Sequence, residues 1–322
     1  MAAIREPDTS FHLQAHPPTS VQPGGGTCLQ IELAWGRLRR RYLRLLRPDY
    51  VRSMLSLRQG ECPYCPHDII DPRDLKFCRN VCGYWFRPQD DRFAWRGRLG
   101  LARPGLAEVV CFSLLFAALT GLSVTGGLWI HPLLYIPLVV IAPIWLFVLS
   151  FFRDPTRVIP TDPAALVSPA DGKVTHIDEI DSPDFLGGRA LRISIFLSVF
   201  NVHVNRSPRL CRVTNVRYFP GEFLDARHGQ CAVRNEQLWL DLHDETTGTP
   251  LLVKQISGAI ARRIVCWLKP GDLLQPGERF GMIKFGSRTE VLLPTGLHYE
   301  VKVKVGNMVS GGSSILLRYV GK

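Results

Sequence analysis

Residues 279–294 read RFGMIKFGSRTEVLLP, and this stretch decides the fold predicted for the C-terminal half of the chain. Two apolar runs flank the pair Gly286-Ser287, whose residue types favour tight turns. Taken alone, the pair predicts the turn of a β-hairpin. Similar short runs, separated by glycine and proline, lie at 191–199, 202–204, 212–218, 237–242, 251–256, 263–267, 300–305 and 314–320. Their spacing predicts a mainly β domain over residues 154–322, built as a barrel or a sandwich.

The closing stretch, residues 299–317, is similar to half of a lipoyl/biotinyl-type barrel. A Val-Lys-Val-Lys-Val strand is followed by Gly306, a turn at Gly311-Gly312 and another strand. A swinging-arm carrier needs its lysine at an exposed hairpin tip, whereas Lys302 and Lys304 fall inside the predicted strand. We therefore take the similarity as structural only.

Composition places the chain among folded proteins. Of its 322 residues 46% are apolar and 21% are charged, which excludes a disordered or fibrous protein. A net charge of +11 favours polyanionic partners, namely nucleic acid, anionic lipid or phosphorylated substrates. The nine cysteines do not suit a secreted disulfide framework and favour reduced thiols that face the cytosol.

A long uncharged segment precedes the β domain. Residues 109–152 contain no Asp, Glu, Lys or Arg over 44 positions. One helix of that length would extend about 66 Å, twice the roughly 30 Å of a bilayer core. The break between Gly126 and Pro132 therefore predicts a transmembrane hairpin over 105–153, with helices near 106–125 and 133–152. The alternative is a buried helical pair, although soluble helices rarely run so far without charge.

Arginine flanks this hairpin on both sides, while its turn carries no Lys or Arg. The arginines are Arg92, Arg96, Arg98 and Arg103 before it, and Arg153 and Arg157 after it. By the positive-inside rule both flanks face the cytoplasm. We expect a protein of the cell membrane whose β domain lies on the cytoplasmic side.

Two segments begin the chain. Residues 1–27, with runs of Pro and Gly, predict a disordered tail. Residues 28–60 predict a basic amphipathic helix, because 31–58 hold eight arginines against two acids with leucines at near-helical spacing. Such a helix could lie on anionic lipid, pack on its own domain or bind nucleic acid, and the neighbouring hairpin favours lipid.

Residues 61–100 hold two pairs of closely spaced cysteines. Cys62 and Cys65 are separated by twelve residues from Cys78 and Cys82. This spacing approximates a four-cysteine zinc ribbon, although the second pair is one residue wider than usual. A structural zinc site and unmetallated thiols fit the pattern equally well, and a disulfide is a third alternative.

Three polar residues are candidates for chemistry. Asp171 lies on a predicted tight turn before a strand, and His203 lies within an otherwise apolar β-run. Separately they are typical of a turn residue and of a core or surface histidine. Together with Ser287 they supply an orienting group, a base and a nucleophile, which is what the activation of a hydroxyl requires.

Several further blocks stand in the sequence in one order, from about residue 105 to 320. They are FFRDP with Ile159-Pro160, SPADG at 168–172, FLSVFNVHVNRSP at 196–208, GEFL at 221–224, residues 256–267 with Ala261-Arg262-Arg263, and 280–294. In these blocks and their order the chain resembles the pyruvoyl-dependent phosphatidylserine decarboxylases, in particular the short membrane-anchored form.

This resemblance implies a proenzyme that cuts itself between Gly286 and Ser287. Ser287 then becomes a pyruvoyl group that caps a chain of 36 residues (322 − 286), which stays associated with residues 1–286. The pyruvoyl ketone forms a Schiff base with phosphatidylserine and accepts the electrons released with carbon dioxide. Asp171 and His203 would support the self-cleavage, and His203 would also reprotonate the product.

The same resemblance implies partners for the lipid. Arg206, Arg262 and Arg263 are candidates for binding the lipid phosphate. No nucleic-acid partner is expected. The sequence is compatible with a homo-oligomer. Arg206 stands where longer members carry a second histidine, so that the acid and base duties fall on His203 or on a group that the sequence does not identify. Two other functions compete with this one: a non-enzymatic membrane-anchored zinc-ribbon adaptor, and a pyruvoyl decarboxylase of a soluble amino acid.

Overall fold

The computed structural model describes residues 26–63, 65–181, 184–259, 263–284 and 286–320. It divides into two compact units, residues 1–91 with 157–322 and residues 92–156. The tail predicted over 1–27 lies outside the described residues except for its last two positions, which begin helix α1 (Gly26–Leu46).

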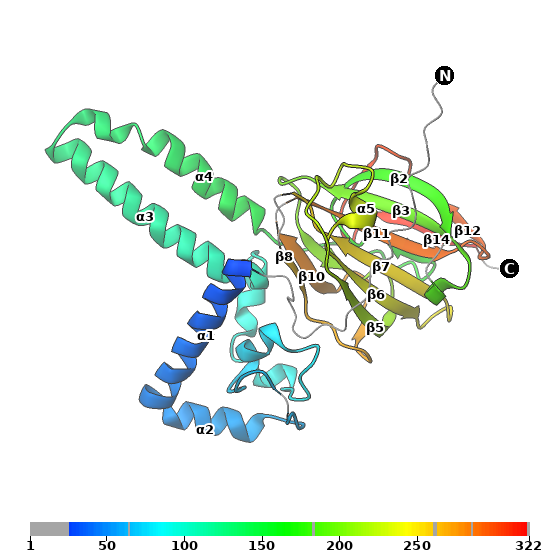
Figure 1. Ribbon diagram of the computed structural model, residues 1–322, viewed down its shortest axis with the longest axis horizontal. Coiled ribbons are helices and arrows are strands. Elements are labelled where there is room, and N and C mark those ends of the chain that lie inside the picture. Colours follow the sequence, from blue (N-terminus) through cyan, green and yellow to red (C-terminus); the bar gives the residue numbers. More distant parts are fainter. Residues whose placement is uncertain (1–25, 64, 182–183, 260–262, 285, 321–322) are drawn as a thin grey trace. The chain divides into compact units, whose positions relative to one another are not determined.

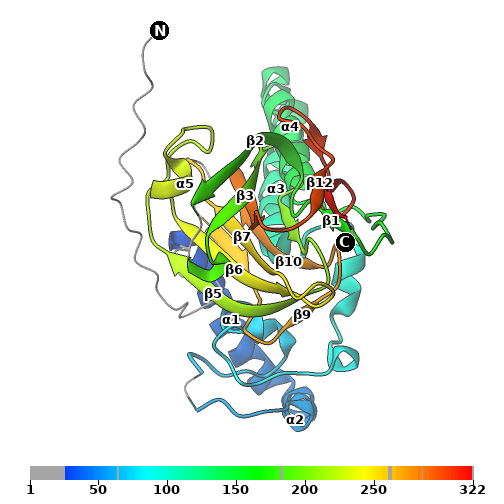
Figure 2. The ribbon, with the colours of Figure 1, turned by 90° about the vertical axis from the view of Figure 1, so that its right-hand side faces the viewer.

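The larger unit is built around an eight-stranded antiparallel sheet that curls on itself (Figure 1, Figure 2). This confirms the prediction of a mainly β domain. The strands of this sheet, in spatial order, are β13 (Met308–Val309), β2 (Gly172–Asp181), β3 (Arg189–Leu197), β11 (Ser287–Pro294), β7 (Pro250–Ile256), β6 (Gln237–Asp244), β5 (Cys211–Phe219) and β9 (Leu273–Leu274).

Two three-stranded sheets complete the β structure. They are β1 (Ala165–Val167), β14 (Ile315–Tyr319) and β12 (Tyr299–Val301), and β4 (Val204–Arg206), β10 (Arg279–Lys284) and β8 (Arg263–Cys266). The strand predicted over 300–305 is wrong beyond Val301, because the chain turns where the Lys304 N–H donates to Asn307 Oδ1 at 2.8 Å. The lipoyl-like half stays a prediction. Two short helices, η6 (Asp184–Leu186) and α5 (Cys231–Arg234), lie in the connections.

The predicted hairpin at Gly286-Ser287 is wrong. Strand β10 pairs with β4 and β8, whereas β11 pairs with β3 and β7, so the pair connects two different sheets. Ser287 and Thr289 lie on the face of β11 that also carries Val291 and Leu293, which belong to the main core. Arg288 and Glu290 lie on the opposite face, and both faces are buried.

The smaller unit contains α3 (Leu106–Trp129) and α4 (Leu138–Phe151), which lie side by side (Figure 1). Trp145 Nε1 donates to Ser113 Oγ at 3.0 Å between them, and the Ala102 N–H donates to the Phe152 carbonyl at 2.6 Å where the flanks meet. The 3-10 helices η3 (Ala94–Arg98), η4 (Arg103–Gly105) and η5 (Pro132–Tyr135) complete this unit. Two helical spans, of 27 and 20 residues, are long and apolar enough to cross a membrane.

The basic N-terminal segment forms two helices instead of the single predicted one. Helix α1 ends at Leu46 and α2 (Pro48–Leu57) begins directly after Arg47, whose φ of −140° is not helical. A proline disfavours helical geometry at the residue before it, which explains the break. Two 3-10 helices follow, η1 (Pro72–Phe77) and η2 (Pro88–Asp90).

Candidate active site

The peptide bond between Gly286 and Ser287 lies where the chain passes from one sheet to the next. Gly286 has a φ of +64°, in the left-handed region that favours glycine. The Ser287 side chain is fully buried, and its hydroxyl has no hydrogen-bond partner among the described residues. Because burial removes the hydroxyl from water without compensation, this serine is held in a costly state with its oxygen available for reaction.

Gly258 confines the carbonyl group of Gly286. A Cβ atom at residue 258 would lie only 2.4 Å from the Gly286 oxygen. The segment that carries Gly258 is itself fixed, because the Ser257 N–H donates to the Glu236 carbonyl at 3.0 Å and Asn235 Nδ2 donates to the Ser257 carbonyl at 2.7 Å. The carbonyl carbon next to Ser287 is therefore held by packed backbone.

His203 contacts the N–H of Gly286, in the peptide that precedes the scissile bond. Its ring is fully buried, and it lies just before β4 rather than inside the predicted β-run, because β3 ends at Leu197 and a turn follows. Nδ1 lies 2.8 Å from the Asn201 carbonyl, which can only accept, so Nδ1 carries the proton. The Gly286 N–H donates to Nε2 at 3.2 Å. The neutral imidazole thus directs its basic nitrogen at the residue before Ser287.

Asp171 lies on a turn directly before β2, as predicted, but it is engaged elsewhere. Arg157 Nη2 donates to Oδ2 at 2.7 Å, and the Gly311 N–H donates to Oδ1 at 2.7 Å. Within the described part of the chain, no hydrogen bond joins this carboxylate to His203 or Ser287. The structure brings His203 to the N–H of Gly286, one residue before Ser287, and leaves Asp171 bound to Arg157.

The three candidate phosphate-binding arginines have different surroundings. Arg206 is buried and its Nη1 donates to the Gly277 carbonyl at 3.1 Å. Arg263 is also buried and pairs with Glu32 of α1. Arg262 lies outside the described residues.

A polar network that the sequence did not predict lies inside the curled sheet on the Ser287 face. Asn205 Nδ2 donates to Thr289 Oγ1 at 3.0 Å, and Gln255 Nε2 donates to Asn205 Oδ1 at 2.8 Å. All three side chains are fully buried. A signal existed in the sequence, because Gln255, with Lys254 before it, interrupts an apolar β-run and Asn205 lies two residues after His203.

The opposite face of β11 carries buried charges. Glu290 Oε1 accepts a hydrogen bond from Ser194 at 2.8 Å and lies 3.8 Å from Arg288 Nη1. Lys254, on the neighbouring strand β7, places its Nζ 3.9 Å from the ring centre of Trp239. Burial and the nearby arginines lower the pKa of Lys254 to about 8, although Glu290 opposes this shift. Charged residues thus line β11 directly behind the candidate nucleophile.

Comparison with known proteins identifies the family. The phosphatidylserine decarboxylase family model matches residues 144–317. The phosphatidylserine decarboxylase proenzyme of Rhodopirellula baltica is 44% identical over 76% of this chain and 99% of its own length. Those of Desulfotalea psychrophila and Symbiobacterium thermophilum are 49% and 48% identical, over 53% and 56% of this chain and 78% and 82% of theirs.

The chain belongs to the phosphatidylserine decarboxylase family. Membership of this proenzyme family implies a pyruvoyl group, which is made from a residue of the chain itself. The surroundings of Ser287 fit such a conversion, since the hydroxyl is buried without a partner and the neighbouring carbonyl is fixed. The family model begins at residue 144, so the cysteine-containing segment precedes the matched residues.

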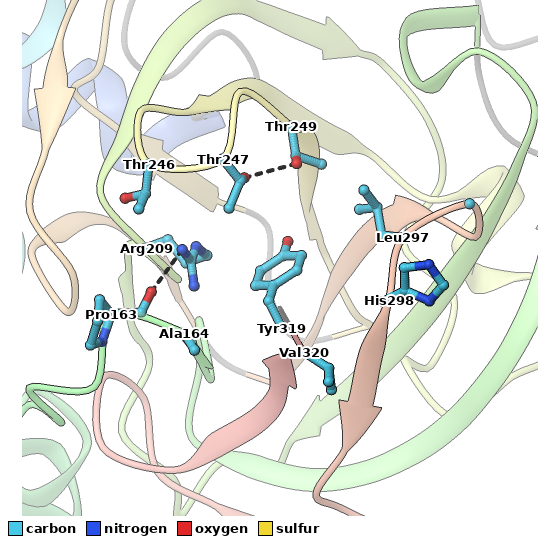
Figure 3. A pocket seen from close by; sticks show the side chains of 11 residues that line it. Pro163, Ala164, Arg209, Thr246, Thr247, Thr249, Leu297, His298, Tyr319 and Val320 are labelled. Carbon is cyan, nitrogen blue, oxygen red and sulfur yellow. Dashed lines mark hydrogen bonds between the residues drawn. The ribbon is translucent and has the colours of Figure 1, made fainter. Parts of the chain in front are cut away.

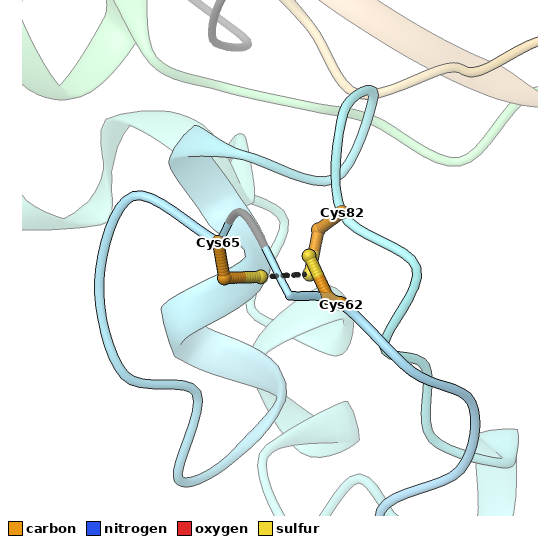
Figure 4. A group of neighbouring side chains, drawn as sticks. All are labelled: Cys62, Cys65 and Cys82. Atoms are coloured by element: carbon orange, nitrogen blue, oxygen red, sulfur yellow. Dashed lines mark hydrogen bonds between the residues drawn. The ribbon is translucent and has the colours of Figure 1, made fainter.

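Three of the four candidate zinc ligands lie together in this family member (Figure 4). The sulfur atoms of Cys62, Cys65 and Cys82 are all within 4.8 Å of one another. Cys78 packs in the same cluster, but its Sγ lies 3.7 Å from the Asp74 carbonyl oxygen. No disulfide joins the cysteines whose side chains the structure describes.

A separate cavity of about 640 Å³ lies on the same unit (Figure 3). Its lining includes Arg209, whose guanidinium is already paired with Asp244 and lies 4.6 Å from the ring centre of Tyr319. The described residues that line it include neither His203 nor Ser287. We assign it no part in the chemistry of the family.

Proposed function

We propose that this chain decarboxylates phosphatidylserine to phosphatidylethanolamine with a pyruvoyl group formed at Ser287. Membership of the family supports the substrate and the reaction. The contact of His203 Nε2 with the Gly286 N–H, beside the partnerless Ser287 hydroxyl, is the observation that supports the position of the group.

The self-cleavage proceeds through atoms of the chain itself. Ser287 Oγ attacks the Gly286 carbonyl carbon, the C–N bond breaks, and the amide becomes an ester with a free amine on residue 287. Loss of the Cα proton of residue 287 then expels the Gly286 carboxylate and leaves dehydroalanine. Water replaces its nitrogen, which departs as ammonia, and a ketone remains at the new chain terminus.

His203 supplies the proton transfers in this proposal. Its Nε2 lone pair lies at the Gly286 N–H, and a small movement of the turn would exchange that contact for the Ser287 hydroxyl. In the decarboxylation the pyruvoyl carbonyl withdraws the electrons that carbon dioxide leaves behind. His203, once protonated, returns a proton to the substrate carbon. Asp171 does not touch the reacting atoms in this proposal; it supports cleavage by holding the turn before β2 in place. Arg206 and Arg262 bind the lipid phosphate.

The large and small chains stay associated after cleavage. Residues 287–322 provide the central strand β11, which is hydrogen-bonded to β3 on one side and to β7 on the other. They also provide β12 and β14, and β14 pairs with β1 of the large chain. Separation would expose the buried faces of β11 and the unpaired edges of its neighbours.

The membrane arrangement has two parts in this proposal. Helices α3 and α4 cross the bilayer as a hairpin, and the arginines at its flanks keep both ends on the cytoplasmic side. Helix α1 lies on the same membrane surface through a face whose apolar side chains are 50 to 78% exposed. This apolar stripe comprises Trp35, Leu38, Tyr42, Leu45 and Leu46, and Arg37 and Arg41 beside it are exposed.

The cysteine cluster holds a structural zinc ion in this proposal. Three sulfur atoms within 4.8 Å of one another can share one ion with Zn–S bonds of about 2.3 Å, and Cys78 can supply the fourth. We expect one zinc per chain by elemental analysis of the purified protein. Cys82→Ser should lose it while Cys111→Ser retains it. An unchanged metal content in Cys82→Ser would refute this site.

Changing Ser287 to Ala tests the function directly. We expect a full-length, inactive protein that still reaches the membrane, whereas the control Ser56→Ala is cut and active. Cutting of Ser287→Ala at this bond would refute the assignment.

The two competing functions predict other results. If the chain is a non-enzymatic adaptor, wild-type material contains an intact chain. If it is a decarboxylase of a soluble amino acid, it acts on free serine rather than on phosphatidylserine in liposomes.

A further inference from the structure

Helix α1 places a carboxylate against the strands that lead to the candidate cleavage site. Glu32 is only 9% exposed and lies among three cations. Lys76 Nζ lies 2.7 Å from Oε2, Arg263 donates to Oε1, and Lys284 Nζ lies 3.8 Å from Oε1. Residue 32 lies more than a hundred positions before the start of the family match.

Two of these cations belong to strands that approach the scissile bond. Arg263 begins β8, and Lys284 ends β10 two residues before Gly286. The two residues are register partners in the β8–β10 pair, and their side chains are both 4% exposed. Burying two like charges on adjacent strands is costly unless a counter-charge lies against them. Glu32 supplies such a counter-charge to both.

A second contact holds the other end of β8. Arg79, between Cys78 and Cys82, donates from Nη1 to the Trp267 carbonyl at 2.6 Å and from Nη2 to Asp272 Oδ1 at 3.0 Å. Trp267 directly follows the last residue of β8. The N-terminal segment thus binds β8 at both ends, and β8 is the strand that pairs with β10.

We propose that Glu32 is a positioning residue for self-cleavage: by binding Arg263 and Lys284 it fixes the end of β10, and with it the Gly286 carbonyl relative to the Ser287 hydroxyl. This inference rests on the proposed cleavage at Gly286-Ser287. Glu32 itself does not touch the reacting atoms. Small errors in the placement of reacting groups slow a reaction strongly, so the loss of this contact should act on the rate of cutting.

The test follows cutting of the full-length precursor over time, after synthesis into lipid nanodiscs, by gel electrophoresis. Glu32→Gln removes the charge and should slow cutting by about tenfold or more. Glu32→Asp keeps the charge and should restore part of the rate. Lys76→Gln is the matched control, because it removes the third cation of the cluster and residue 76 lies in η1, outside β8 and β10. It should be cut at nearly the wild-type rate.

The outcomes separate this inference from the proposed function. Rates are compared at equal amounts of protease-resistant precursor, so a loss of folding is not counted as slow cutting. Three results would overturn the role of Glu32. They are a wild-type cutting rate in Glu32→Gln, a cutting rate in Lys76→Gln as low as that in Glu32→Gln, and a cutting rate in Glu32→Asp no higher than that in Glu32→Gln. Ser287→Ala in the same assay tests the proposed function alone, since cutting of that variant would refute the site whatever Glu32 does.

Discussion

At the scale of single residues, the site depends on how closely Gly258 approaches the Gly286 carbonyl. A Cβ atom there would lie 2.4 Å from a backbone oxygen, so the Gly258→Ala precursor must displace the peptide that is to be cut. We expect self-cleavage to slow by about a hundredfold, which is typical of a misplacement near 1 Å. The measurement is the fraction of uncut chain over time on a reducing gel.

Gly229→Ala is the control for this substitution, since a Cβ atom at residue 229 would meet nothing within 4 Å. It should be cut at the wild-type rate. Equal cutting rates in the two variants would contradict the claim that Gly258 positions the carbonyl.

Glu236 accepts a hydrogen bond from the Ser257 N–H through its backbone carbonyl, and its side chain should make the stability of the fold depend on pH. Burial raises the pKa of its carboxyl to about 7, although a hydrogen bond from Tyr218 opposes the shift. Because the folded-state pKa lies above the unfolded value, this group favours folding below about pH 4.5, and that contribution is lost as the pH rises through 7. Glu236→Gln should remove this component, worth up to about 3 kcal/mol. Unfolding midpoints between pH 4.5 and 8 would measure it, and an unchanged slope in Glu236→Gln would contradict it.

Residue chemistry was easier to predict from the sequence than residue contacts. His203 and Ser287 could be named because their side chains can act as base and nucleophile, and the structure brings His203 to Gly286. The engagement of Asp171 by Arg157 depends on distant residues, so spacing alone could not predict it. Asn205 and Gln255 were not predicted because their pairing joins strands fifty residues apart.

At the scale of elements, the exposed stripe on α1 predicts an interaction with lipid. Leu38→Asp should raise the KM for phosphatidylserine in mixed vesicles by about ten- to hundredfold, because a buried leucine contributes about 1.5–3 kcal/mol. The kcat should not change, since residue 38 is remote in sequence from the site and 59% exposed. Kinetics at varied surface fractions of phosphatidylserine would measure both.

Leu55→Asp on α2 is the matched control, because Leu55 is also exposed but lies outside the stripe. It should retain the wild-type KM. A similar rise in both variants, or in neither, would count against a lipid-binding face on α1.

Elements were predicted well where their signal is local and poorly where it is not. The uncharged run of 109–152 indicated the two apolar helices, and short apolar runs separated by glycine and proline indicated most strands. The pairing of β10 and β11 with different sheets was missed, because a Gly-Ser turn has the same composition whether its strands pair or separate. The helix break at Pro48 is an exception, because the proline is a local signal but the basic amphipathic pattern on both sides of it indicated a single helix.

At the scale of the whole molecule, cleavage should leave one particle made of two chains. The small chain contributes β11 to the centre of the large sheet, so its removal would dismantle the core. We expect the mature protein in mild detergent to elute as one species containing both chains, which separate in SDS. Elution of the small chain by itself without denaturant would contradict this arrangement.

The central claim is that the chain converts its own Ser287 into a pyruvoyl group. The most direct measurement is the intact mass of the small chain from active protein. The uncut full-length chain of Ser287→Ala serves as the reference. We predict a fragment of residues 287–322 that is lighter than the encoded peptide by one ammonia, blocked to N-terminal sequencing and reactive toward carbonyl reagents. An active preparation in which residue 287 is an unmodified serine within an intact chain would contradict the claim.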